Sequence, residues 1–225
     1  MQLNFTPVIE SLPFLLQGVG MTLFVTVVSM ALALLWGLAL ALLRRVKLIP
    51  VRTLTKIYID FFRGVPLLVL LLWMYFGVGV FLGLDLSPLQ AAIATLVIQG
   101  AANLAEIYRA GIEAIPKGQV EAAKALGLTR FQSFIDVVFP QALPIIVPAI
   151  GNDFIGMVKG SALVSVLGVV ELTRAAQMRA NFFLRPFEFL TVTAVIYVIL
   201  ALSWGQVFTL LESRFRWVQR AKARS

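Results

Sequence analysis

The chain has 225 residues, of which 60% are hydrophobic and 13% charged, and this composition excludes a water-soluble globule, because soluble domains are about 45–50% apolar and about 25% charged. It contains no cysteine and no histidine, which excludes a disulfide framework, a Cys/His zinc site and a histidine general base. The 19 basic and 11 acidic residues give a net charge of +8, typical of a nucleic-acid-binding protein or of a membrane protein with basic cytoplasmic loops.

The first apolar stretch runs without a charge over 11–43, which exceeds the about 20 residues that a helix needs to cross a bilayer. We place the first span at about 18–43 and assign 5–17, with its two prolines and one glutamate, to an interfacial segment. Residues 1–11 contain no Lys or Arg, and no small-x-small cleavage site follows, so a cleavable signal peptide is disfavoured. The sequence therefore predicts an uncleaved first helix.

Two further uncharged stretches, 64–84 and 86–105, are separated by Asp85 alone. They predict a helical hairpin with a very short turn. The uncharged stretch 189–211 is long enough for the last span.

The region between the hairpin and the last span is apolar but interrupted. We place a fourth span at about 143–158 and expect 161–170 to form a half-inserted helix. The chain is thus predicted to be an all-α membrane protein with about five transmembrane helices. The interrupting residues are Pro140, Pro144, Pro148, Asp153 and Lys159.

The distribution of basic residues predicts an orientation. Fifteen of the 19 Lys and Arg residues lie in the loop after the first span, the loop after the third span and the C-terminal tail. Because cytoplasmic loops are enriched in Lys and Arg, we expect the N-terminus outside and the C-terminus inside. Nucleic-acid binding would need these residues on one soluble face, so we expect no nucleic-acid partner.

The one extended polar section, 109–140, carries signs of a structured helix. Arg109 and Glu113 are four residues apart, and Lys117 and Glu121 repeat that spacing after Pro116, which suits a helix start. Charge pairs alone are also compatible with an ordinary solvated surface helix.

A spaced motif in this section carries more information. Glu121-Ala122-Ala123 is followed by Gly127 after three residues and then by Val137-Val138-Phe139-Pro140 after nine more. This pattern resembles the EAA loop of the integral-membrane permeases of ABC importers, with Val137 and Phe139 replacing Ile and Leu. The similarity to the polar-amino-acid permease subfamily covers nearly the whole chain and includes the segments 15–23, 63–69, 105–111, 115–123 and 171–174.

The resemblance implies how the chain would use ATP. No phosphate-binding G-x-x-x-x-G-K-[ST] loop is present, so this chain is predicted to bind no cofactor itself, with ATP and Mg²⁺ held by a separate subunit. In the family, a short cytoplasmic coupling helix docks in a cleft of the ATP-binding subunit. The alternative for Gly127 is a simple helix end, where glycine tolerates positive φ. The residues assigned to coupling are Glu121, Ala122, Ala123, Gly127 and Pro140.

We therefore expect a multi-pass permease subunit in the bacterial cytoplasmic (inner) membrane. Its implied partners are ATP-binding subunits, a second permease chain, an extracytoplasmic amino-acid-binding protein and membrane lipid. The expected organisation is an N-terminal segment at 1–17, a transmembrane domain at 18–216 with its coupling loop at about 112–140, and a basic tail at 217–225.

Polar residues inside the apolar spans suggest a substrate path, because an ionised group there is costly unless it faces protein, water or a counter-charge. Asp153 and Lys159 lie in a segment similar to a family motif, in which Gly160 replaces an acidic residue. Asn103 replaces a Tyr that the family commonly has just upstream of the position of Glu106. The alternatives are amides that hydrogen-bond between helices and a Lys159 that extends to the headgroups. The substrate-path candidates are Gln99, Asn103, Asn152, Asp153 and Ser161.

Glu106 and Arg109 lie one helical turn apart, which favours an intrahelical ion pair or a gate. Two other functions stay open on the sequence: an ion-coupled secondary amino-acid transporter, and a membrane anchor that recruits a soluble partner without transport. No catalytic constellation is visible, and the identity and charge of the amino acid are not specified by the residues.

Overall fold

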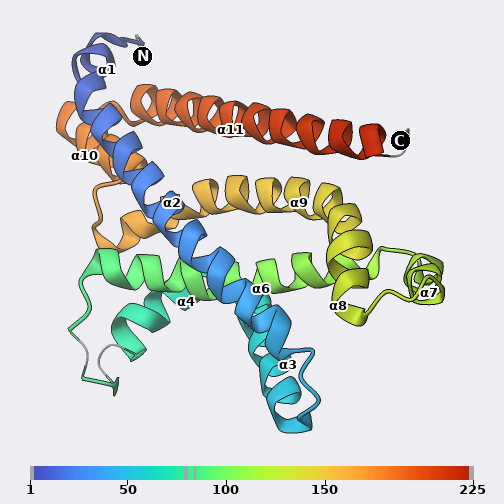
Figure 1. Ribbon diagram of the computed structural model, residues 1–225. Helices are drawn as coiled ribbons and strands as arrows, with labels where there is room; N and C mark the ends of the chain where they lie inside the picture. The colour runs from blue at the N-terminus through green and yellow to red at the C-terminus, as the bar shows by residue number, and fades with distance from the viewer. Residues whose placement is uncertain (1–2, 79–80, 84, 223–225) are drawn as a thin grey trace.

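The protein is a bundle of helices in the computed structural model, which describes residues 3–78, 81–83 and 85–222 and contains no β-strand among them (Figure 1). Four segments are long and apolar enough to cross a membrane, and a bent helix pair raises the number to five if it is one span. The elements, in order, are α1 (Thr6–Glu10), α2 (Leu12–Leu43), α3 (Ile49–Gly64), α4 (Leu67–Leu72), the π-helix η1 (Trp73–Val78), α6 (Pro88–Glu113), α7 (Lys117–Ala125), α8 (Arg130–Gln132), the π-helix η2 (Ser133–Val138), α9 (Phe139–Gly160), the 3₁₀-helix η3 (Ser161–Leu167), α10 (Leu172–Phe183) and α11 (Pro186–Lys222).

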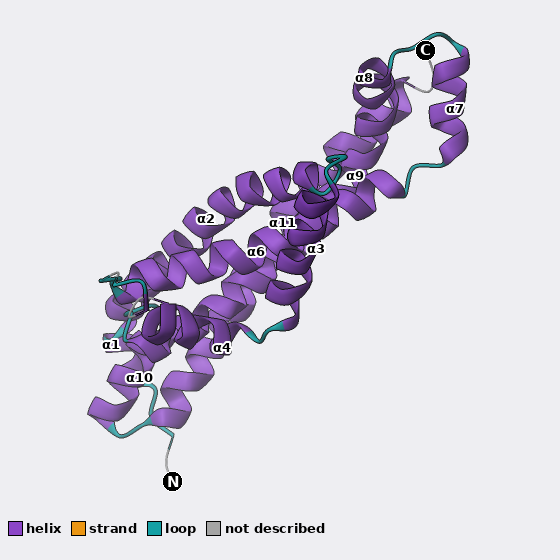
Figure 2. Ribbon diagram, turned by 90° about the horizontal axis from the view of Figure 1, so that it is seen from below, coloured by secondary structure: helices purple, strands orange, loops and turns teal. Residues whose placement is uncertain are grey.

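The two termini lie at opposite ends of the molecule. Figures 1 and 2 show the N-terminus at one end, and the end of α11 together with α7 and α8 at the other. This arrangement agrees with an odd number of crossings. It leaves open which end is cytoplasmic.

The first span is longer than predicted, because α2 begins at Leu12 and so includes residues 12–17 of the expected interfacial segment 5–17. Pro13 lies in the first turn of α2, where a missing backbone N–H costs nothing. The third predicted span also extends further: α6 continues past Ala105 to Glu113.

The second predicted span, 64–84, contains α4 and η1, but the segment before it is a helix and not the loop that we expected. Helix α3, which we assigned to a loop, is followed by α4 and η1 across a bend of 109°. The bend falls at Val65, which is extended before Pro66, as expected for a residue that precedes proline. Helix α3 was missed because it is amphipathic, with basic residues along one side, and a search for uncharged stretches ignores such helices. The predicted end of this span, residue 84, lies outside the described residues.

The fourth predicted span, 143–158, lies within one helix that its prolines do not end. Helix α9 runs through Pro144 and Pro148, and η3 continues it directly as a 3₁₀ turn that ends at Gly168, whose φ is 86°. Each proline removes one helical hydrogen bond, but the surrounding helices keep the segment in place. In place of the expected separate half-inserted helix at 161–170, residues 161–167 form η3, which continues α9 directly. The last predicted span lies within α11, which passes without a break across the expected boundary at residue 216.

The core is built from small residues where helices cross. Helix α2 packs against α6 with Gly37 close to Leu104 and Ala101, and Ala33 and Ala105 are also fully buried. In a membrane, close backbone approach of this kind replaces the hydrophobic effect as the main source of helix association.

The buried carboxylate of Glu171 connects α2, α10 and α11 at the end of the molecule that carries the N-terminus. Glu171 caps α10 by accepting hydrogen bonds from the backbone N–H groups of Thr173 and Arg174, at 2.9 and 2.8 Å. The Tyr197 hydroxyl of α11 donates to it at 2.8 Å and the Thr22 hydroxyl of α2 at 3.4 Å. Burial raises the pKa of Glu171, although these hydrogen bonds act in the opposite direction. The family-like segment 171–174 thus has a clear structural role.

Candidate functional site

The predicted coupling loop forms an ordered helix with a glycine end. Helix α7 starts after Pro116, and Gly127, with φ of 81°, follows its end. The Gly127 N–H donates to the Lys124 carbonyl at 2.9 Å and the Leu128 N–H to the Ala123 carbonyl at 3.1 Å. This pair of bonds is the Schellman arrangement, which needs a residue with positive φ. The positive φ inferred for Gly127 is therefore confirmed.

One face of this element is turned to solvent. Ala123 is buried as α7 packs on η2, whereas the large apolar side chains of Leu126 and Phe131 are 83% and 74% exposed. Pro140, by contrast, lies in the first turn of α9 and is half-buried. We call the exposed group the α7 surface; it consists of Glu121, Ala122, Leu126, Gly127 and Phe131.

The sequence reasoning missed Leu126 and Phe131 as members of the α7 surface. The signal was available in the sequence, since large apolar side chains in an otherwise polar loop are typical of an interaction surface. The described residues contain no ion pair between Lys117 and Glu121 despite their spacing, so Glu121 is not held by that neighbour.

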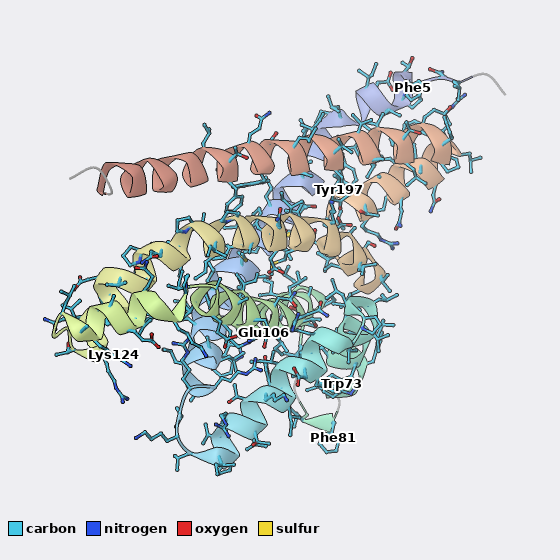
Figure 3. The ribbon with its side chains drawn as sticks, turned by 90° about the vertical axis from the view of Figure 1, so that its right-hand side faces the viewer. Phe5, Trp73, Phe81, Glu106, Lys124 and Tyr197 are labelled. Carbon is cyan, nitrogen blue, oxygen red and sulfur yellow. The ribbon has the colours of Figure 1, made fainter. Side chains whose placement is uncertain are left out.

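A charged cluster joins the end of α2 to the C-terminal half of α6. The predicted pair of Glu106 and Arg109 is confirmed, with Nη2 and Nε of Arg109 at 2.6 and 2.9 Å from Oε2 of Glu106. Arg109 also pairs with Glu113, and Arg44, from the end of α2, donates to the other oxygen of Glu106. Arg44 was not identified from the sequence, because it is 62 residues away from Glu106. Figure 3 shows Glu106 inside the bundle and Lys124 on the projecting α7.

Three of the five substrate-path candidates meet at one cavity. Gln99 and Asn103 on α6 and Asp153 on α9 line a cavity of about 240 Å³ beside α4. The Asn103 amide donates to Oδ1 of Asp153 at 3.1 Å, and the buried Oδ2 of Asp153 has no hydrogen-bond partner among the described residues. Such an unpaired oxygen inside a membrane protein is costly, which makes it a candidate to accept a ligand's hydrogen bond.

Gln99 also hydrogen-bonds to the bend between α3 and α4. Its amide nitrogen donates to the carbonyl oxygens of Phe62 and Val65, at 3.2 and 2.9 Å. These carbonyls belong to the bend between α3 and α4, where the helical bonds are lost. The cavity therefore lies directly against the bent span.

The other two candidates, Asn152 and Ser161, do not line this cavity. Asn152 is exposed and does not line the cavity, and the Ser161 hydroxyl is buried and donates to the Val158 carbonyl at 2.7 Å. Lys159 is exposed and forms no ion pair with Asp153. Adjacent residues point in different directions on a helix, so Asn152 cannot share the direction of Asp153. Gly156, one turn after Asp153, lines the cavity and was missed.

Comparison with known proteins identifies the family. Residues 33–217 match the family described as binding-protein-dependent transport system inner membrane component. The chain is 38% identical over 206 residues to the probable amino-acid permease protein YxeN of Bacillus subtilis, covering 91% of this chain and 92% of that protein. It is 34% identical over 220 residues to the glutamate/aspartate import permease protein GltK of Escherichia coli O157:H7, covering 95% and 98%.

Two solved ABC transporter structures are similar to this chain in fold as well as in sequence. A chain from the crystal structure of an amino acid ABC transporter with histidines has a TM-score of 0.90 and 37% identity, with 95% of this chain and 100% of that chain covered. The MetNI methionine ABC transporter, in an inward-facing conformation, gives a TM-score of 0.76 and 26% identity, with 92% and 98% covered. The long apolar helices and helix α7 agree with these similarities. The chain therefore belongs to the binding-protein-dependent inner-membrane component family, the permease subunits of ABC transporters, and is a multi-pass inner-membrane protein.

Proposed function

We propose that this permease carries a polar amino acid inward and is driven by a separate ATP-binding subunit that docks on the α7 surface. The observation that carries the proposal is the exposure of Leu126, at the glycine-terminated end of α7, and of Phe131, on the adjacent helix α8. Exposed apolar side chains on an ordered polar element are typical of a protein interface. ATP and Mg²⁺ would be held by that subunit, with a second permease chain and an extracytoplasmic binding protein completing the transporter.

Gly127→Asp tests the coupling. A Cβ at Gly127 meets no atom within 4 Å, so the new side chain would point into the docking space, and the positive φ adds backbone strain. We expect the complex to lose ATP hydrolysis stimulated by the binding protein while remaining inserted in the membrane.

The matched control is Gly118→Asp, which puts the same charge at the other end of α7, again with no atom within 4 Å of the Cβ but without positive φ. Gly127→Asn separates strain from charge, because asparagine tolerates positive φ. Unchanged stimulation in Gly127→Asp would show that this surface is not the coupling element. A transporter driven by an ion gradient would keep uptake in all three variants without any ATP-binding subunit.

We further propose that the 240 Å³ cavity is part of the substrate path, with Asp153 and Asn103 presenting an acceptor and an amide to the amino acid. Asp153→Asn removes the charge at nearly constant size, and should reduce uptake or change its selectivity while complex assembly and basal ATP hydrolysis persist. Because Asp153 has no ion pair with Lys159, a second change, Lys159→Met, should give no rescue. Rescue would mean that the two charges stabilise each other.

Gly156→Leu is a steric test of the same cavity. The Cβ of residue 156 would meet no atom within 4 Å, so the leucine can enter the cavity without displacing the helices. Uptake should fall while the amount of assembled complex stays normal. Gly20→Leu is the control, because Gly20 on α2 is exposed and equally free of neighbours. Equal uptake in both variants would exclude the cavity from the path.

The orientation and domain limits are part of the proposal. The N-terminus is outside, the C-terminus inside, with an extracytoplasmic segment at 1–17, a transport domain at 18–216 and a basic tail at 217–225, of which 223–225 lie outside the described residues. This rests on the distribution of Lys and Arg. A reporter fused to the C-terminus should be active only if it functions in the cytoplasm; the opposite result would reverse the orientation.

A further inference from the structure

A second, larger cavity lies near the end of the molecule that carries α7. Its volume is about 870 Å³, and it is lined by residues of α2, α3, α6, η2 and α9. Much of the wall is apolar and includes Leu38, Leu42, Leu143 and Val147. The cavity shares no lining residue with the smaller one at Asp153.

The rim of this cavity carries an excess of positive charge. Arg44 and Arg109 are neutralised by Glu106 and Glu113. Three further cations at the rim are exposed and have no acidic partner in the part of the chain that the structure describes: Arg45, Arg52 and Lys56.

Helix α3 adds a second feature that matches a membrane boundary. Arg52 and Lys56 are four residues apart on one side, while Leu54, Ile57 and Phe61 are 67%, 58% and 50% exposed. An amphipathic helix with exposed apolar side chains and basic residues is the kind that lies against anionic lipid. The cavity therefore opens where a lipid headgroup would meet free cations and its chain would meet an apolar wall.

We propose that this cavity binds an anionic phospholipid, with its phosphate at Arg45, Arg52 and Lys56 and an acyl chain along Leu42, Leu143 and Val147. A free amino acid or inorganic anion would leave the apolar wall in contact with water, whereas a zwitterionic lipid would leave the cations uncompensated. The lipid belongs to the inner leaflet if the proposed orientation is right; the site itself does not depend on it. Phe134 of η2 also lines the cavity, and α7 packs on η2. The lipid would therefore contact the segment that supports α7.

The test uses the complete transporter in detergent, with phosphatidylglycerol and phosphatidylethanolamine as probes in native mass spectrometry. The wild-type complex should retain phosphatidylglycerol in preference to phosphatidylethanolamine. In Arg52→Gln/Lys56→Gln the affinity for phosphatidylglycerol should fall by roughly 30-fold, since each basic residue near a membrane surface contributes about fivefold. The charge-matched control is Lys47→Gln/Arg63→Gln, which removes two exposed cations that do not line the cavity.

A steric variant tests the apolar wall independently of charge. Val147→Trp fills the cavity and should displace phosphatidylglycerol with the basic rim intact, whereas Ile145→Trp, on the exposed side of α9, should not. Equal retention in Arg52→Gln/Lys56→Gln and its control, or in the two tryptophan variants, would overturn the proposal.

Another protein chain in the cavity would also overturn it. The chain has no cysteine of its own, so Thr53→Cys places a single thiol in the lining. Crosslinking of this thiol to another subunit of the assembled transporter, with a short reagent, would show that protein fills the site.

Discussion

Gly37→Ala should disrupt the crossing of α2 and α6 by a predictable amount. The added Cβ would lie 2.8 Å from the Leu104 Cβ and 2.9 Å from the Ala101 carbonyl oxygen, against the 3.4 Å at which ordinary contact begins. Neither obstacle can rotate away, because one is a Cβ and the other a backbone atom, so the helices must separate. Overpacking of this kind costs about 1–3 kcal/mol.

The matched control is Gly20→Ala on the same helix, where the new Cβ meets no atom within 4 Å. Replacing glycine by alanine within a helix gains up to about 1 kcal/mol from propensity, and this gain is common to both variants. Their difference therefore isolates the clash, at about 1–3 kcal/mol.

Thermal unfolding of the purified transporter in one detergent measures that difference. For a domain of this size, 1 kcal/mol corresponds to about 2–4 °C in Tm, so Gly37→Ala should unfold several degrees below Gly20→Ala. Equal Tm values would refute the reasoning, because they would mean that α2 and α6 are not held together by close approach at Gly37.

Three further outcomes are expected. Glu106→Gln should destabilise the complex by roughly 1–3 kcal/mol, because it removes the negative charge that two arginines share. Glu113→Gln should cost under about 1 kcal/mol, because the Glu113 side chain is 57% exposed. Equal losses of stability in thermal unfolding would contradict this difference. Gly111→Ala should also destabilise, since its Cβ would overlap Cγ1 of Ile146, and Gly111→Ala/Ile146→Ala should be no less stable than Ile146→Ala alone. Because burial raises the pKa of Glu171, the folded state binds more protons than the unfolded state at pH values just above the ordinary glutamate pKa. The Tm should therefore fall as the pH rises through that range. Glu171→Gln should remove this pH dependence.

The sequence alone determined the class of the protein and the features that depend on neighbours along the chain. Long uncharged stretches located most of the spans, because a helix in lipid must satisfy its own backbone bonds and present apolar side chains. The positive φ of Gly127 and the pairing of Glu106 with Arg109 followed from local spacing, and both appear in the structure. These features need no knowledge of how the helices pack.

The tertiary structure decided which polar residues act together. Asn103 and Asp153 are 50 residues apart, and Arg44 and Glu106 are 62 apart, yet each pair is in contact. Asn152, by contrast, is adjacent to Asp153 and points elsewhere. The rotation of each helix about its axis, fixed by close packing at small residues such as Gly37, selects the side chains that share a cavity, and hydropathy along the chain carries no record of that rotation.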